Sequence, residues 1–264
     1  MKLKDVLEKI HTLSPLEKTL PETTVDTLKF GDPEKEVKKI AVCMHADIDI
    51  IRKAVEAGID LIIPHEPVFY CDAETYKDNN IAAAKMQLLE NNGIALFRYH
   101  DHPHHMVEDM IDCGTIRASG LQGQILPKPY WAVTGFRLDT PMTAREVAAR
   151  LEKSLDTRHI QIAGAADLPG RNIAFACGTP GHITELLLSP DWDFVVTGEM
   201  ICQWNVGELA KDAALTGQNK AVLVLGHCVS EAAGMKVSAE LLQKKLPELE
   251  VAFIPNIPLF NYTE

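Results

Sequence analysis

The sequence lacks any Cys-x-x-Cys pair, although six cysteines are spread along its 264 residues. Their spacing fits neither a zinc ribbon nor the framework of a disulfide-rich secreted domain. We therefore expect buried free thiols in a protein of the reducing cytoplasm. The six positions are Cys43, Cys71, Cys113, Cys177, Cys202 and Cys228.

Several other sequence features are absent, and each absence argues against one class of function. No run of Lys and Arg reaches five residues and the net charge is −11, so we expect no nucleic-acid partner. No apolar run approaches the roughly 20 residues of a membrane span, and the charged N-terminal stretch MKLKDVLEKIHTL does not resemble a signal peptide. A P-loop or other Gly-rich phosphate motif is absent too. We expect a soluble cytoplasmic protein whose acidity can attract metal cations.

What the sequence does contain is an alternation of strands and helices. The apolar run 38–46 predicts a buried strand, Asp47 is a good N-cap for the helix that follows, and 60–66 predicts a second strand. Such a βαβ crossover implies a parallel sheet. A helix over 81–92 and a strand over 94–99 continue the pattern.

A second block of short elements begins near Trp131 and includes a capping-box pattern, Thr143-x-x-Glu146, at the start of a helix. Near residue 221 the first pattern returns, with a strand over 221–227, a helix over 233–245 and a strand over 249–255. We therefore predict an α/β protein of two α/β domains, the second inserted into the first. The expected boundaries are 1–125 plus 221–264 for the first domain and 126–220 for the second.

Three of the predicted strands end in residues that commonly bind metals. In a parallel α/β sheet, ligands bind at the carboxyl ends of the strands, so strands of one sheet would bring these groups to one edge. Imidazole and carboxylate together suit zinc, manganese, iron or nickel, and six ligands suit two ions about 3.5–4 Å apart. The groups are His65-Glu66, then His100 with His102, His104 and His105, and finally His227 with Glu231.

Several alternatives stay open at this point. The tract YHDHPHHM (99–106) could be a surface tract, and Pro103 argues against a helix there, so His100 and His104 share a face only if a loop folds them together. His45 ends the first strand and could line the same cleft, and Glu199 ends a strand of the second block. We take the three other histidines as surface or core residues: His11, His159 and His182.

At these residues the chain resembles the Nif-three-like family of dinuclear metal proteins, which is widely labelled GTP cyclohydrolase 1 type 2. The family pattern GDP-x-x-x-V is present as GDPEKEVKKIAV, and G-A-D-L-I-I-T-H-H-P corresponds to GIDLIIPHEP. The pattern A-H-T-N-L-D corresponds to RYHDHPH, T-G-D/E to VVTGE, and G-H-Y-A-T-E to GHCVSE. Order and spacing agree along nearly the whole chain.

The resemblance implies a dinuclear metal centre at six positions, with the final glutamate bridging the ions. Compared with the family pattern, Glu66 replaces a histidine and His104 replaces an aspartate, so the formal charge of the ligand set is unchanged. Asp101 is the alternative ligand if the register of the loop differs. The expected ligands are His65, Glu66, His100, His104, His227 and Glu231.

The resemblance also implies two α/β domains per chain and a hexameric ring. The function that we expect is a metal-dependent hydrolase resembling GTP cyclohydrolase 1 type 2, acting on a nucleotide or a related small molecule. The candidates for proton transfer are Glu199, His45, His102 and His105. The alternatives are a non-enzymatic metal carrier, sensor or regulatory protein, and an oligomer in which the metal is only structural. Turnover and the rate of metal exchange separate the three hypotheses.

Overall fold

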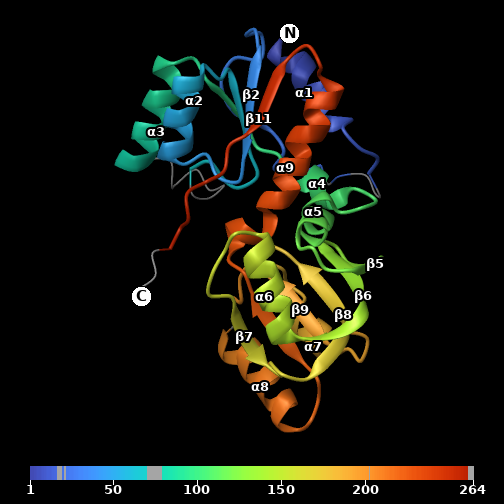
Figure 1. Cartoon of the computed structure of the whole chain (residues 1–264). Coiled ribbons are helices and arrows are strands. Elements are labelled where there is room, and N and C mark those ends of the chain that lie inside the picture. Colours follow the sequence, from blue (N-terminus) through green and yellow to red (C-terminus); the bar gives the residue numbers. More distant parts are fainter. Residues whose placement is uncertain (17–19, 21, 70–78, 202, 261–264) are drawn as a thin grey trace. The chain divides into compact units, whose positions relative to one another are not determined.

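The computed structural model describes residues 1–16, 20, 22–69, 79–201 and 203–260. The chain forms two compact units, each with its own sheet (Figure 1). Unit 1 comprises Met1–Val107 and Met235–Glu264, and unit 2 comprises Glu108–Gly234. The α/β class expected from the sequence is confirmed.

Unit 1 is built on a five-stranded sheet with the order β1-β4-β3-β2-β11. The strands β4, β3, β2 and β11 are parallel, and β1 runs antiparallel to β4 at one edge. This arrangement confirms the parallel sheet expected from the βαβ pattern. The strands are β1 (Leu28–Phe30), β2 (Lys39–Cys43), β3 (Leu61–Pro64), β4 (Ala95–Phe97) and β11 (Glu250–Phe253).

Helices pack on both faces of this sheet. Successive side chains of a strand point to opposite faces, so neighbouring residues of one strand contact different helices. Ala41 and Ile62 pack with residues of α2 and α3, which stand together on one side of the sheet in Figure 1. Val42 and Ile63 instead face α1 and α9 across a small internal space. The helices of this unit are α1 (Leu3–His11), α2 (Ile48–Ala57), α3 (Asn80–Asn91) and α4 (Asp101–His105), together with the later part of α9 (His227–Lys245).

The ends of α2 follow the local chemistry of its sequence. The Asp47 side chain accepts the backbone N–H of Ile50, which satisfies a donor that the first turn leaves free. The helix ends at Gly58, whose φ of 64° lies in the left-handed region that glycine adopts without strain. The start at Asp47 agrees with the sequence prediction, whereas α9 begins at His227, six residues before its expected start.

Unit 2 contains a six-stranded mixed sheet with the order β5-β6-β8-β9-β10-β7. Only β8, β9 and β10 are parallel to one another. Residues of α5 and α6 pack on one face, and residues of α7 and α8 pack on the other. Its elements are α5 (Met110–Ala118), β5 (Gly123–Tyr130), β6 (Val133–Thr143), α6 (Ala144–Ser154), β7 (Gln161–Gly164), β8 (Pro169–Ala176), α7 (Ile183–Leu188), β9 (Phe194–Thr197), a π-helical turn (Gln203–Gly207), α8 (Glu208–Leu215) and β10 (Ala221–Val224).

The strand β10 lies in a different sheet from the one that the sequence suggested. We expected 221–227 to return to the first domain, but Ala221–Val224 pairs with β9 on one side and β7 on the other. Its side chains are buried in the two cores of unit 2, with Leu223 on one face and Val222 on the other. A continuous apolar run specifies a strand buried on both faces, but it does not specify which sheet the strand joins.

The capping box of α6 gives a first testable prediction. The Thr143 hydroxyl accepts the backbone N–H of Glu146 at 3.1 Å, and the Glu146 carboxylate accepts the backbone N–H of Thr143 at 2.8 Å. We expect Thr143→Ala to lower the free energy of unfolding by about 1 kcal/mol in urea denaturation. The control Thr140→Ala, at an exposed position of β6, should stay within about 0.5 kcal/mol of the wild type. Equal losses in both variants would contradict a stabilising role for the cap.

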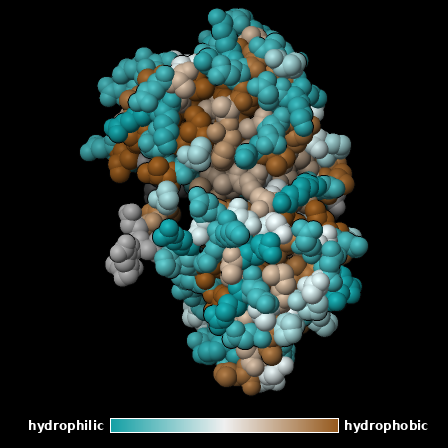
Figure 2. All heavy atoms as spheres, viewed as in Figure 1, coloured by the Kyte–Doolittle hydropathy of each residue, from teal (hydrophilic) through white to brown (hydrophobic). Residues whose placement is uncertain are grey.

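Three further features concern the surface, membrane spans and the burial of the cysteines. The face in Figure 2 is mostly hydrophilic, with hydrophobic residues between the polar ones, as on ordinary protein surfaces. Among the described residues, no helix is both long and apolar enough to cross a membrane. Cys43, Cys113 and Cys177 are buried and Cys228 is half-buried, whereas Cys71 and Cys202 lie outside the described residues.

Candidate metal centre

His65 follows the carboxyl end of β3, and its side chain is completely buried. Its Nδ1 lies 3.0 Å from the carbonyl oxygen of Tyr99. Because a carbonyl only accepts, Nδ1 carries the proton and Nε2 keeps the lone pair that a metal ion needs. Burial, together with the charges of His100 and His104, lowers the pKa of His65 well below its usual value. The imidazole is therefore neutral at pH 7, as metal binding requires.

The tract YHDHPHHM forms the short helix α4, contrary to our expectation that Pro103 would prevent a helix. Pro103 is the third residue of α4, and backbone N–H groups of a first helical turn have no partner within the helix. Proline is therefore tolerated there, since no intrahelical hydrogen bond is lost. The turn brings His100 and His104, four residues apart, to a ring-centroid distance of 5.1 Å.

These three histidines form one cluster, which we call the histidine cluster: His65, His100 and His104. One potential ligand atom from each residue lies within 4.8 Å of the others. The ring of His65 stands 4.5 Å from that of His100 and 5.3 Å from that of His104, between centroids. The sheet edge and α4 thus bring together three of the six ligands expected from the sequence.

Asp101, the alternative ligand, is occupied by other hydrogen bonds. Its Oδ1 lies 3.0 Å from Nδ1 of His100, and its Oδ2 accepts the Thr24 hydroxyl and the backbone N–H of Val25. Burial acts to raise the pKa of Asp101, but these hydrogen bonds from His100, Thr24 and Val25 outweigh it and lower the pKa well below its usual value. Asp101 is therefore a carboxylate that orients His100, in the manner of the partners of metal-binding histidines.

His102 and His105, the remaining histidines of the tract, have other hydrogen-bond partners. Nδ1 of His102 lies 2.5 Å from Oδ2 of Asp26, and its ring stacks on His11 at 4.7 Å with an interplanar angle of 7°. Nδ1 of His105 donates to the backbone carbonyl of Asp101 at 2.8 Å. The structure thus gives His102, a candidate for proton transfer, a structural pairing with Asp26.

Asp26 is a residue that our reading of the sequence did not identify. It lies 74 to 76 residues before its partners at the start of α4, within the stretch TTVDT, and no local motif connects it with the histidines. Burial acts to raise the pKa of Asp26, but hydrogen bonds from the His102 side chain and from the backbone N–H groups of residues 100–102 lower it overall. Only the folded chain shows this link.

Glu66 and His45 lie on neighbouring strand ends of the same unit. Glu66 is buried, and its Oε2 is 3.6 Å from Nη2 of the buried Arg98, which also donates to the carbonyl of His65 at 3.0 Å. The backbone of His45 is held by Asn256, whose side chain both accepts its N–H and donates to its carbonyl. Arg98 therefore compensates the charge of Glu66 in this structure.

A second group of candidate residues lies in unit 2, at the carboxyl ends of the parallel strands β9 and β10. Nδ1 of His227 lies 2.7 Å from Oε1 of Glu199 and 3.0 Å from the Thr179 hydroxyl. Nε2 of His227 lies 3.3 Å from Oε2 of Glu231, which is one helical turn further along α9 and buried. Glu199 and His227 therefore follow strands of the six-stranded sheet, whereas His65 follows a strand of the five-stranded sheet.

Gly178, in the loop after β8, makes room for the Glu231 carboxylate. A Cβ at this position would lie 2.2 Å from Oε1 of Glu231, and its φ of 68° is left-handed. The same loop is tied to α9, because the Gly178 N–H donates to the Ser230 hydroxyl at 3.0 Å. The sequence analysis did not identify Gly178 and Thr179, although a glycine close to the end of a strand is a signal of such a close approach.

The donor chemistry of the histidine cluster fits a divalent transition metal. Neutral imidazoles suit zinc, copper, iron and nickel, and buried ligands with fixed partners for Nδ1 are typical of metal sites.

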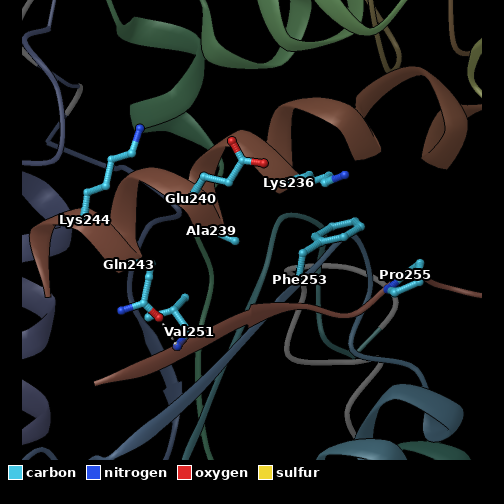
Figure 3. Close-up of a pocket in the computed structure, with 8 residues that line it drawn as sticks. All are labelled: Lys236, Ala239, Glu240, Gln243, Lys244, Val251, Phe253 and Pro255. Atoms are coloured by element: carbon cyan, nitrogen blue, oxygen red, sulfur yellow. Dashed lines mark hydrogen bonds between the residues drawn. The ribbon is translucent and has the colours of Figure 1, made fainter. Parts of the chain in front are cut away.

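The open groove of Figure 3 is a different feature of unit 1: it lies between α9 and β11, with Phe253, Val251 and Ala239 among its lining residues. No residue of the histidine cluster lines it.

Comparison with known proteins places this arrangement in a family. The family description Duf34/NIF3 (NGG1p interacting factor 3) matches residues 1–258. The curated "GTP cyclohydrolase 1 type 2 homolog" of Clostridium perfringens is 24% identical over 259 residues, which cover 96% of this chain and 95% of that protein. The chain belongs to the Duf34/NIF3 family, as the sequence motifs indicated.

Solved structures agree in fold. The Staphylococcus aureus hypothetical protein SA1388 matches with a TM-score of 0.77 and 16% identity, covering 100% of this chain and 99% of that chain. A Bacillus cereus protein related to NIF3 matches with a TM-score of 0.75 and 15% identity, with the same coverage. At such identities the likeness establishes the fold alone, and the chemistry has to be argued from the residues of this chain.

Proposed function

We propose that this protein binds two divalent metal ions per chain and uses them to hydrolyse a nucleotide or a related small molecule. The main observation behind the proposal is the histidine cluster. In it, one potential ligand atom from each of three imidazoles lies within 4.8 Å of the others. The other ligands expected from the sequence stay in the proposed set: Glu66, His227 and Glu231. Zinc, manganese, iron or nickel are the candidate metals.

The proposed ligands would hold the ions, and the ions would supply the chemistry that hydrolysis needs. When bound, divalent ions would act as Lewis acids that polarise the bond to be cleaved and activate water. The 2.7 Å contact of the half-exposed Glu199 with His227 supports a role for Glu199 in orienting His227 and in exchanging protons with solvent. The curated relative's name suggests GTP as the first substrate to test. We also propose self-association into a hexamer, which light scattering would measure.

Metal analysis of protein purified without chelator tests the binding step. We expect about two ions per chain, and loss of bound metal in Glu231→Ala because this carboxylate is buried beside His227. The matched control is Glu240→Ala, an exposed glutamate on the same helix α9, which should bind as much metal as the wild type. Wild-type protein without metal, even after incubation with zinc, manganese and iron, would contradict the proposal.

Turnover then separates an enzyme from a metal carrier or sensor. GTP hydrolysis that stops with a chelator and returns with added metal would support the enzyme. Bound metal that exchanges rapidly without turnover of GTP, other nucleotides or phosphoesters would favour the carrier or sensor. A slowly exchanging metal without turnover would indicate a structural role.

A further inference from the structure

Asp26 is bound to the helix that presents two of the three clustered histidines. Its side chain is fully buried, and its two oxygens accept four hydrogen bonds. Oδ1 accepts the backbone N–H of His100 at 2.6 Å and of Asp101 at 2.9 Å. Oδ2 accepts the backbone N–H of His102 at 2.8 Å and lies 2.5 Å from its Nδ1.

These bonds replace a cap that α4 does not have of its own. The residue in the N-cap position, His100, makes no side-chain capping hydrogen bond. A helix of five residues is too short to be stable by itself, because nucleating a turn costs more than its few hydrogen bonds return. The carboxylate of Asp26, which is distant in the sequence, therefore accepts the N–H groups that an N-cap side chain would otherwise accept.

The neighbouring residue Thr24 extends this support to the side chain of a candidate ligand. The Thr24 hydroxyl donates to Oδ2 of Asp101 at 2.8 Å and accepts the backbone N–H of Asp26 at 3.2 Å. Asp101 in turn faces Nδ1 of His100 at 3.0 Å. The segment Thr24–Asp26 thus holds both the backbone of α4 and the ring of His100.

We propose that Asp26 is a positioning residue for the metal centre: its carboxylate sets the turn that aims His100 and His104 at the ion held with His65. This inference rests on the proposed metal binding and adds a residue that does not itself bind the ion. Removing partners of this kind typically weakens metal binding about 10- to 100-fold. Without Asp26 the same three histidines would remain in the chain but would lose their common orientation.

Asp26→Asn tests the inference, because it preserves size but places an NH₂ group where the backbone N–H groups need an acceptor. The probe is Co²⁺ alone, with affinity measured by chelator competition and geometry by visible absorption. We expect binding about 10- to 100-fold weaker and an altered absorption spectrum. In the metal-free protein, the amide hydrogens of residues 100–102 should exchange about tenfold faster or more, because a charge-assisted acceptor is lost.

The matched control is Asp60→Asn in the same unit. One Asp60 oxygen likewise accepts two backbone N–H groups, those of Lys38 and Lys39, and Asp60 is not part of the histidine cluster. It should bind Co²⁺ with wild-type affinity and spectrum, even if the protein is less stable. If Asp26→Asn fails to fold, Thr24→Val offers a milder test, for which we expect weaker Co²⁺ binding and a changed spectrum.

The outcomes distinguish this inference from the function on which it rests. Wild-type affinity and spectrum in Asp26→Asn, or in Thr24→Val where that variant replaces it, would overturn the positioning role and leave the metal-binding proposal intact. An equal loss in Asp60→Asn would also overturn it, since the effect would then follow from general destabilisation. A wild-type protein that takes up no Co²⁺ would overturn both.

Discussion

Replacing His65 with alanine is expected to weaken metal binding by the histidine cluster strongly. His65 is the completely buried member of the cluster, its ring lies 4.5 and 5.3 Å from the other two between centroids, and its Nδ1 is held by the carbonyl oxygen of Tyr99. Removing a direct ligand should cost more than the roughly 10- to 100-fold loss caused by removing its supporting partners. We therefore expect Zn²⁺ affinity to fall by more than about a hundredfold.

Thermal unfolding with and without Zn²⁺ measures this effect on the folded protein. A ligand at 100 times its Kd stabilises the native state by about 2.7 kcal/mol, so the wild type should show a clear rise in Tm. In His65→Ala the rise should shrink, because its affinity is lower. The matched control His182→Ala removes a histidine that stacks on Tyr130 in unit 2 and should keep the wild-type rise. A full rise in His65→Ala would mean that the cluster does not bind zinc.

The sequence predicted the strand-end histidines because their chemistry and their position depend on local signals. A buried apolar run such as 60–66 is recognisable as a strand, and residues after it must lie at the carboxyl end of a parallel sheet. The adjacent strands β3 and β4 therefore bring His65 near His100, as expected. Caps such as Asp47 and Thr143 were predictable for the same reason, since each acts within three residues.

What the sequence could not reveal depends on pairings between distant segments. The run 221–227 resembles the strands of the first unit, yet Val222 and Leu223 are buried in the cores of the second. Similarly, Pro103 suggested a loop because its effect depends on where a helix begins, and that start is fixed by Asp26. Tertiary hydrogen bonds therefore decided both the sheet membership and the helix that orders the ligands.

Replacing Gly178 with alanine is expected to impair metal binding in unit 2 more than it impairs stability. A Cβ here would lie 2.2 Å from Oε1 of Glu231, so that carboxylate must move. The displaced atom is the end of a flexible side chain, and the cost to folding should therefore stay near the roughly 1 kcal/mol of a left-handed φ. Glu231 is a proposed ligand and is buried, so its displacement should weaken metal binding at least about tenfold.

Two other glycines of the same unit separate the causes. Gly217 also has a left-handed φ, 83°, but a Cβ there would meet nothing within 4 Å. Gly217→Ala should therefore lose as much free energy of unfolding as Gly178→Ala and bind metal normally. Gly181, in the same loop as Gly178, has neither the left-handed φ nor a close neighbour, and Gly181→Ala should resemble the wild type in both measurements. Normal metal affinity in Gly178→Ala would argue that Glu231 is not a ligand, because its carboxylate cannot keep its place beside the new methyl group.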